Sequence, residues 1–296
     1  MQIGRISTAM VTPFSASGAV DYDKTALLIE HLIANGSDSV VICGTTGESP
    51  TLTTVEKEEL LTFTIKTVNK RIPVIAGTGS NSTAESIENT KMAERVGADG
   101  IMLVTPYYNK PDQKGLYAHF STIALETTLP VLMYNIPGRS VINMLPETTI
   151  ALSKVKNIRA IKEASGNLEQ MATIIAGTDD SFAVYSGDDG LTLPLLAIGG
   201  NGVVSVAAHV VGNEMQKMIA AFGEGRTKEA AAMHRAFIPL FSALFVSPNP
   251  VPVKYALRKL NIDTGGVRLP LVGYGDQNID FDKVWESFLK NELIFA

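Results

Sequence analysis

Lys162 is the residue whose position in the sequence most strongly suggests chemistry. It closes a short apolar run that begins at Asn157, and strand alternation would place Ile158, Ala160 and Lys162 on one face. Burial lowers the pKa of a lysine, so free amine is present at neutral pH and can attack a carbonyl carbon. A strand-end lysine more often reaches solvent, so the rest of the chain must decide between these interpretations.

A tyrosine and a glycine-rich turn supply groups that such an amine would need. Tyr134 ends the apolar run before that of Lys162, and a tyrosine hydroxyl transfers protons when hydrogen bonds or a nearby cation tune it. The turn at residues 44–47 contains Thr45 and Thr46, and its backbone N–H groups suit a carboxylate. An ordinary βα turn with a threonine cap explains the same turn equally well.

Arg139 is the candidate for binding a second anionic group. It follows the tripeptide Ile-Pro-Gly, and a rigid Pro-Gly turn would aim its planar guanidinium at a carboxylate. A surface arginine is the alternative. The interpretation that unites Arg139 with Lys162, Tyr134 and the threonines is condensation or cleavage of a keto acid through a lysine imine, which needs no metal and no bound cofactor.

Other nucleophiles and metal ligands are sparse. Asp188 and Asp189 fit a helix N-cap and its neighbour better than a metal site, and Cys43 is expected inside a strand, in the core. The histidines fall in helical stretches or away from the strand ends: His31, His119, His209 and His234. We therefore predict no metal site, and we expect the glycines at 199–202 to lead into a strand rather than to bind a phosphate.

Eight short apolar or β-branched runs alternate with helical stretches. The runs are Ser7–Val11, Ser39–Cys43, Pro73–Ala76, Gly100–Val104, Pro130–Tyr134, Ile158–Lys162, Phe182–Tyr185 and Gly202–Val206. This alternation predicts a (β/α)8 TIM barrel, whose chemistry lies at the carboxyl ends of its strands. An open doubly wound sheet is the alternative, but no Gly-x-Gly-x-x-Gly turn follows the first strand.

Helix signals complete the expected architecture. Thr53-x-x-Glu56 and Ser82-x-x-Glu85 read as capping boxes. Residues 227–245 and 253–260 are helical in pattern, and the last helix is expected to carry an apolar stripe of Phe281, Val284, Trp285, Phe288 and Leu289. We expect a catalytic barrel at residues 1–225 and a C-terminal helical domain at residues 226–296.

Composition excludes several classes of partner. The net charge is -5 with no basic cluster, which argues against nucleic acid. Cys43 is the only cysteine, so no intrachain disulfide forms, as suits a reducing compartment such as the cytoplasm. The longest apolar window, residues 191–211, is broken by glycines, so no membrane span is expected, and the first residues lack the apolar core of a signal peptide.

Five segments together resemble one enzyme family. They are Gly44–Ser49, Pro106–Asn109, Tyr134–Arg139, Ile161–Ala164 and Ser186–Asp189. From the first expected strand to about Leu271, the chain resembles the dihydrodipicolinate synthase (4-hydroxy-tetrahydrodipicolinate synthase) family of the neuraminate lyase-like class I aldolases. The arginine after Ile-Pro-Gly indicates the synthases, because lyase-type members lack it there.

The resemblance implies four catalytic residues. Lys162 would form an imine with pyruvate, and Tyr134 would carry protons to and from it. Thr45 would link Tyr134 to Tyr108, which is expected to come from a neighbouring subunit of a homotetramer built as a dimer of dimers, although a dimer would suffice. The enamine would attack L-aspartate 4-semialdehyde, and ring closure would release a precursor of lysine and diaminopimelate.

The resemblance also implies how the substrates are held. Backbone amides of Thr45 and Thr46 would bind the pyruvate carboxylate, and Arg139 would bind the carboxylate of the semialdehyde. Gly187 and Val204 would line the pocket, Val204 through its backbone carbonyl.

A second site of the family is expected to be altered. Lysine-inhibited members bind lysine at a subunit interface, and the matching residues here are Ser49, Asn81, Glu85 and Tyr107. Thr54 and Lys57 stand where inhibited members carry histidines. Lys57 would bring a cation toward a cationic ligand, so we expect weak or absent inhibition by lysine.

Three other functions compete with this interpretation. Another pyruvate-dependent lyase, acting on a sugar acid or neuraminate, would share the lysine and the tyrosine. A non-catalytic barrel could bind a small molecule as a sensor. A phosphosugar isomerase fits less well, because such sites usually need a glutamate base and a clearer phosphate loop.

Overall fold

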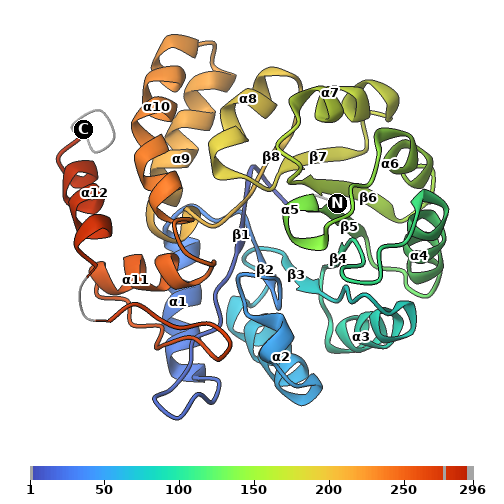
Figure 1. Cartoon of the computed structure of the whole chain (residues 1–296), viewed down its shortest axis with the longest axis horizontal. Helices are drawn as coiled ribbons and strands as arrows, with labels where there is room; N and C mark the ends of the chain where they lie inside the picture. Colours follow the sequence, from blue (N-terminus) through green and yellow to red (C-terminus); the bar gives the residue numbers. More distant parts are fainter. Residues whose placement is uncertain (1–2, 276–277, 292–296) are drawn as a thin grey trace.

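Eight parallel strands form a closed barrel (Figure 1). The computed structural model describes residues 3–275 and 278–291. Each strand pairs with the next one in sequence and β8 pairs with β1, which excludes an open sheet. The strands confirm the eight predicted runs with slightly shifted ends: β1 (Ile6–Ala9), β2 (Ser39–Ile42), β3 (Val74–Gly77), β4 (Gly100–Val104), β5 (Val131–Asn135), β6 (Ile158–Glu163), β7 (Ala183–Ser186) and β8 (Gly202–Ser205).

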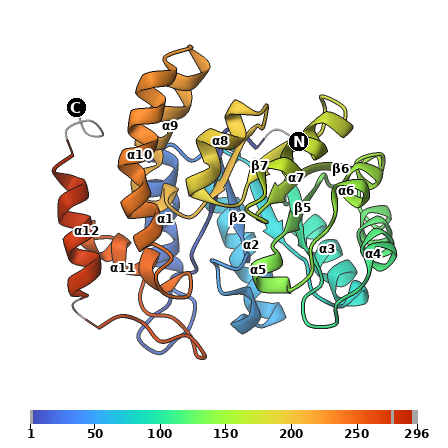
Figure 2. The ribbon, with the colours of Figure 1, turned by 45° about the horizontal axis from the view of Figure 1, so that its top comes forward.

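Helices surround the barrel and follow its strands (Figure 2). The longer ones are α1 (Tyr22–Ala34), α2 (Thr54–Val68), α3 (Thr83–Val96), α4 (Gln113–Leu125), α6 (Pro146–Leu152), α7 (Leu168–Gly177), α8 (Thr192–Ala197) and α9 (Ala208–Gly223). Three short pieces lie in the loops after strands: η1 (Ser49–Thr51), α5 (Pro137–Ser140) and η2 (Asp189–Leu191).

The two predicted capping boxes have different outcomes. Thr53 and Glu56 cap each other at the start of α2, as expected. Ser82 accepts a hydrogen bond from the Glu85 backbone N–H at the start of α3, but the Glu85 carboxylate accepts from the Ser80 hydroxyl at 2.7 Å instead of turning back to Ser82. The second box is therefore only half formed.

Apolar side chains form two separate layers, one inside the barrel and one between the strands and helices. The interior cluster includes Ala9, Val41, Ile75, Met102, Leu132, Tyr134, Ala160 and Val204. The expectation that Ile158 shares a face with Ala160 is wrong, because Ile158 packs in the outer layer. The pairing of β5 with β6 shifts register there, matching Val131 with Ile158 but Leu132 with Ala160, and this irregularity breaks the alternation.

Three C-terminal helices cover one side of the barrel: α10 (Thr227–Ala243), α11 (Val251–Lys259) and α12 (Ile279–Leu289). α10 packs against α9, and α12 packs against α10 on the side away from the barrel (Figures 1 and 2). The predicted stripe of α12 buries Phe281, Trp285 and Phe288, but Leu289 is 49% exposed and does not belong to it. Among the described residues, no helix has the length and apolar content to cross a membrane.

Candidate active site

Lys162 lies near the carboxyl end of β6, inside the barrel, and is only 6% exposed. Its Nζ lies 4.1 Å from the centroid of the Tyr134 ring on the neighbouring strand. No hydrogen bond or ion pair reaches this amine from the described residues. The pKa of Lys162 is lowered to about 8, chiefly by burial; the Asp189 carboxylate opposes this change and the Arg139 charge adds to it. The amine is therefore prepared for nucleophilic attack near neutral pH.

Tyr134 and Thr45 come together beside the amine. Burial raises the pKa of Tyr134 to about 12, whereas the Arg139 guanidinium and a hydrogen bond with Thr45 act in the opposite direction. The phenol therefore keeps its proton at neutral pH and can donate it, and Thr45 is its hydrogen-bond partner.

The ends of β5 and β6, which carry Tyr134 and Lys162, are held in register by contacts on the outer face of the barrel. One residue beyond Tyr134 and Lys162, Asn135 and Glu163 pair across β5 and β6, and the Asn135 amide donates to the Glu163 carboxylate at 3.1 Å. Gln170 of α7 donates to the same carboxylate at 3.0 Å. Sequence reasoning missed this network, although strand alternation places both residues opposite the candidate site.

A cavity of about 470 Å³ opens above the lysine. It is lined by most of the predicted site residues: Thr45, Thr46, Tyr134, Arg139, Lys162 and Gly187. The other side of the cavity is formed by residues that the sequence analysis did not predict. They are Phe241 and Ser242 of α10 and Phe245 and Asn249 of the following loop. No local pattern in the C-terminal segment marks these residues as parts of a site.

Gly187 makes room for the lysine side chain. A Cβ atom at this position would lie 2.6 Å from the Ala164 Cβ and 3.1 Å from the Lys162 Cε. Val204 belongs to the interior cluster, but on this part of the barrel Val206 lines the cavity. The expected role of the Val204 carbonyl therefore stays a prediction.

The backbone that carries Arg139 to the cavity has a different conformation from the one expected. Residues Pro137–Ser140 form the short helix α5, with proline in its first turn, and not an isolated Pro-Gly turn. The Arg139 side chain still borders the cavity, and its charge acts on both Lys162 and Tyr134.

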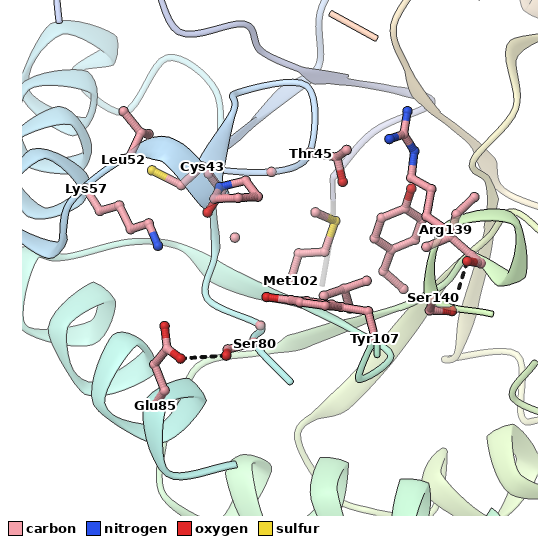
Figure 3. Close-up of a pocket in the computed structure, with 18 of the residues that line it drawn as sticks. Cys43, Thr45, Leu52, Lys57, Ser80, Glu85, Met102, Tyr107, Arg139 and Ser140 are labelled. Carbon is pink, nitrogen blue, oxygen red and sulfur yellow. Dashed lines mark hydrogen bonds between the residues drawn. The ribbon is translucent and has the colours of Figure 1, made fainter. Parts of the chain in front are cut away.

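A second cavity, of about 500 Å³, shares Thr45, Tyr134 and Arg139 with the first and extends toward α2 and α3 (Figure 3). It is bordered by Ser49, Thr54, Lys57, Ser80, Glu85 and Tyr107. In Figure 3, Lys57 and Glu85 extend from their helices toward the same space. Asn81 does not border it, but its amide donates to the Tyr107 carbonyl at 3.1 Å.

Tyr108 stands apart from the residues that it was predicted to join. It is 89% exposed and has a φ of 74°. A left-handed backbone is costly for a tyrosine. The contribution of Tyr108 to a neighbour's site, which the family resemblance implies, stays a prediction.

Two aspartates and a cysteine that were not predicted to be catalytic lie just beyond strands β7 and β2. Asp188 caps η2, as expected, but Asp189 is more than the neighbour of a cap: its fully buried carboxylate accepts hydrogen bonds from Ser205 and from the N–H groups of Val206 and Ala207. Cys43 is buried one residue beyond β2, and burial raises its pKa to about 12.

The histidines and the glycine cluster lie away from the reactive centre. His31, His119, His209 and His234 all lie in outer helices, and no three His, Cys, Asp or Glu side chains of the described residues form a metal-binding group. A Cβ on Gly202 would lie 2.1 Å from the Arg5 carbonyl oxygen, which explains the glycine at the start of β8, at the end of the barrel away from the cavity.

A closed parallel barrel with a buried lysine at the carboxyl ends of its strands places the chain among the (β/α)8 enzymes. The sequence model of the dihydrodipicolinate synthetase family matches residues 2–280. The chain is similar to the 4-hydroxy-tetrahydrodipicolinate synthase of Bacillus velezensis, with 58% identity over 272 residues, covering 92% of this chain and 94% of the relative. The synthase of Oceanobacillus iheyensis is 50% identical to this chain, and the aligned residues cover 99% of this chain and 100% of the relative.

Solved structures agree with the sequence relatives. The fold superimposes on a dihydrodipicolinate synthase from Bacillus anthracis with a TM-score of 0.95 and 50% identity, covering 98% of this chain and 99% of the other. A dihydrodipicolinate synthase from Cyanidioschyzon merolae with lysine bound gives a TM-score of 0.93 at 50% identity, with 97% of each chain covered. The chain belongs to the dihydrodipicolinate synthetase family.

Proposed function

We propose that the chain catalyses the 4-hydroxy-tetrahydrodipicolinate synthase reaction, the condensation of pyruvate with L-aspartate 4-semialdehyde in lysine and diaminopimelate biosynthesis. The observation that carries this proposal is the buried amine of Lys162, which forms no ion pair with any of the described residues, lies against Tyr134 and opens into a cavity bordered by Arg139. The family and its named relatives support the same reaction.

The reaction begins with attack of the Lys162 amine on the ketone carbon of pyruvate. The ketone oxygen takes up one proton from Tyr134 and one from the attacking amine and leaves as water, which gives a protonated imine. The imine then draws electrons from the methyl carbon, which loses a proton to the Tyr134 phenolate and becomes an enamine. The imine is itself the electron sink, so this chemistry requires no further cofactor. Backbone N–H groups at Thr45 and Thr46 hold the substrate carboxylate.

The enamine carbon next attacks the aldehyde of the second substrate. The aldehyde oxygen takes a proton from Tyr134 and becomes the hydroxyl of the product. The amino group of the semialdehyde then adds to the imine carbon, closes the ring and displaces Lys162, which leaves as free amine. Arg139 holds the semialdehyde carboxylate and so orients the aldehyde toward the enamine.

Arg139 separates this function from that of another pyruvate-dependent lyase. Replacing Arg139 with alanine should lower condensation about 100-fold, as expected for loss of a charge-assisted contact, while imine formation with pyruvate persists. If the variant condensed the semialdehyde as well as the wild type, the assignment of the second substrate would be wrong.

The proposal includes a homotetramer, a dimer of dimers, in the cytoplasm. The exposure of Tyr108 supports a neighbour that covers it, because a tyrosine that completes the proton path must come from another subunit if it points away from its own. The single cysteine of the chain suits a reducing compartment.

The direct test is the activity of the wild type and of Lys162→Ala with pyruvate and aspartate semialdehyde. We expect the variant to lose at least about 1000-fold in kcat, since the covalent route is closed. Full activity in Lys162→Ala would refute the imine mechanism. An inactive wild type that binds pyruvate without forming an adduct would favour a small-molecule sensor.

A further inference from the structure

Thr46 is held by a residue that lies 203 positions further along the chain. The Asn249 side-chain amide donates to Thr46 Oγ1 at 2.8 Å, and both side chains are buried beside the cavity that contains Lys162. Among the described residues, this is the only hydrogen bond of the Thr46 hydroxyl. Because the oxygen accepts from Asn249, its own proton is available to an acceptor in the cavity.

The turn that carries Thr46 is anchored on its far side by the same C-terminal segment. Lys254 of α11 pairs with Glu48 at 2.8 Å and donates to the Thr12 and Gly266 carbonyls at 2.7 Å each. The backbone N–H of Arg268 donates to the Glu48 carboxylate at 2.9 Å. These contacts fix the distance between the turn and the loop of Asn249, so the amide meets the hydroxyl in a set geometry.

The cost of burying Asn249 shows that its amide does not serve stability alone. Its Oδ1 is buried and has no hydrogen-bond partner among the described residues. A half-satisfied buried amide is worse for folding than an apolar side chain of similar size. A functional contact with Thr46 accounts for a polar residue at this position.

We propose that Asn249 is a positioning residue for pyruvate: it directs the Thr46 hydroxyl proton toward the keto-acid carboxylate. This inference rests on the proposed function and adds a contact from outside the barrel to the backbone cradle at Thr45 and Thr46. A hydroxyl pointed at a carboxylate strengthens substrate binding more than it changes the chemical step. Loss of Asn249 should therefore act on the KM for pyruvate and leave kcat almost unchanged.

The test compares Asn249→Ala, Asn249→Asp, Thr46→Val and the double variant Thr46→Val/Asn249→Ala. The readouts are the KM for pyruvate and the pyruvate concentration that half-saturates borohydride inactivation. We expect Asn249→Ala to raise both about fivefold with kcat within about twofold. Asn249→Asp should raise them further, because a carboxylate cannot donate and repels the substrate carboxylate.

The double variant decides whether Asn249 acts through the hydroxyl. In the Thr46→Val background, loss of Asn249 should have no further effect on the KM for pyruvate. An equal increase in both backgrounds would overturn the proposal, and so would an unchanged KM in Asn249→Asp, which would mean that the hydroxyl donates to residue 249.

Ser247→Ala is the matched control, because Ser247 lies in the same loop but accepts its hydrogen bond from Tyr274. This variant should keep the wild-type KM, and a shift as large as that of Asn249→Ala would assign the effect to the loop and overturn the proposal. Wild-type protein that forms no adduct with pyruvate would instead refute the proposed function. Wild-type protein that forms the adduct, with Asn249 variants unaltered, would refute only this inference.

Discussion

Two lysines are buried in the described part of the chain, and their surroundings differ in the one respect that matters for reactivity. Lys162 is 6% exposed and Lys254 is 5% exposed. The Lys254 amine contacts the Glu48 carboxylate and two backbone carbonyls. Among the described residues, the Lys162 amine has no hydrogen-bond or ion-pair partner, and it lies over the face of the Tyr134 ring.

The difference shows how one residue type serves both structure and chemistry. Burial lowers the pKa of both lysines, but at Lys254 the Glu48 carboxylate counteracts it, which favours the ammonium form. At Lys162 the nearby charges largely oppose each other, because Asp189 and Arg139 have opposite signs. A paired ammonium holds three chain segments together, whereas an unpaired amine remains available to a ketone.

The largest effect should come from breaking the paired site. Lys254→Met leaves Glu48 buried without its cation, so we expect a loss of about 3–5 kcal/mol in the free energy of unfolding, measured with urea. The double variant Lys254→Met/Glu48→Gln should recover part of this loss, because it removes the unpaired charge. A single variant as stable as the wild type would show that the pair does not anchor the turn.

Lys162→Met should change stability in the opposite direction. The pKa of Lys162 falls from 10.5 to about 8 in the folded chain, so the burial penalty on the charged amine is complete below pH 8 and fades as the pH rises to 10.5. We expect a gain of about 2–3 kcal/mol at pH 7 that shrinks at higher pH. Destabilisation of the size predicted for Lys254→Met would mean that Lys162 is also a structural cation.

The rate of imine formation should follow the deprotonation of Lys162. At a fixed pyruvate concentration, we expect borohydride inactivation to accelerate about tenfold per pH unit below pH 8 and then to level off. Tyr134, with a pKa of about 12, stays protonated throughout this range. A rate that is independent of pH between 6 and 8, or one that rises steadily to pH 10, would contradict the lowered pKa.

The smallest effect concerns a third lysine, Lys57, which borders the second cavity together with Thr54 and Glu85. Because its ammonium group faces the space that a cationic ligand would enter, submillimolar lysine should not inhibit the condensation in a steady-state assay. Lys57→His should increase sensitivity to lysine. Strong inhibition of the wild type at these concentrations would refute the prediction.

Much of the barrel could be read from the sequence because its signals are local. Each β-branched run marks a strand, and the polar residues that follow it must gather at one rim. The sequence therefore predicts that Lys162, Tyr134, Thr45 and Arg139 lie together. The irregular pairing at Ile158 could not be predicted from the sequence, because the register between β5 and β6 depends on two strands rather than on one.

The C-terminal contribution was hidden for a similar reason. Asn249 and Lys254 reach the turn at residues 44–48 across more than 200 positions, and nothing near them in sequence indicates that contact. Asp189 looked like the neighbour of a cap because its burial depends on Ser205 and the start of α9. Such residues are defined by tertiary contacts alone.

The most direct test of the contrast is to find which lysine pyruvate modifies. The protein is treated with pyruvate and borohydride, digested, and the reduced adduct is assigned to a peptide by mass spectrometry. We predict one adduct, on Lys162, with Lys254 unmodified and no adduct in Lys162→Met. An adduct on Lys254, or one that persists in Lys162→Met, would contradict the claim that the unpaired amine of the barrel is the nucleophile.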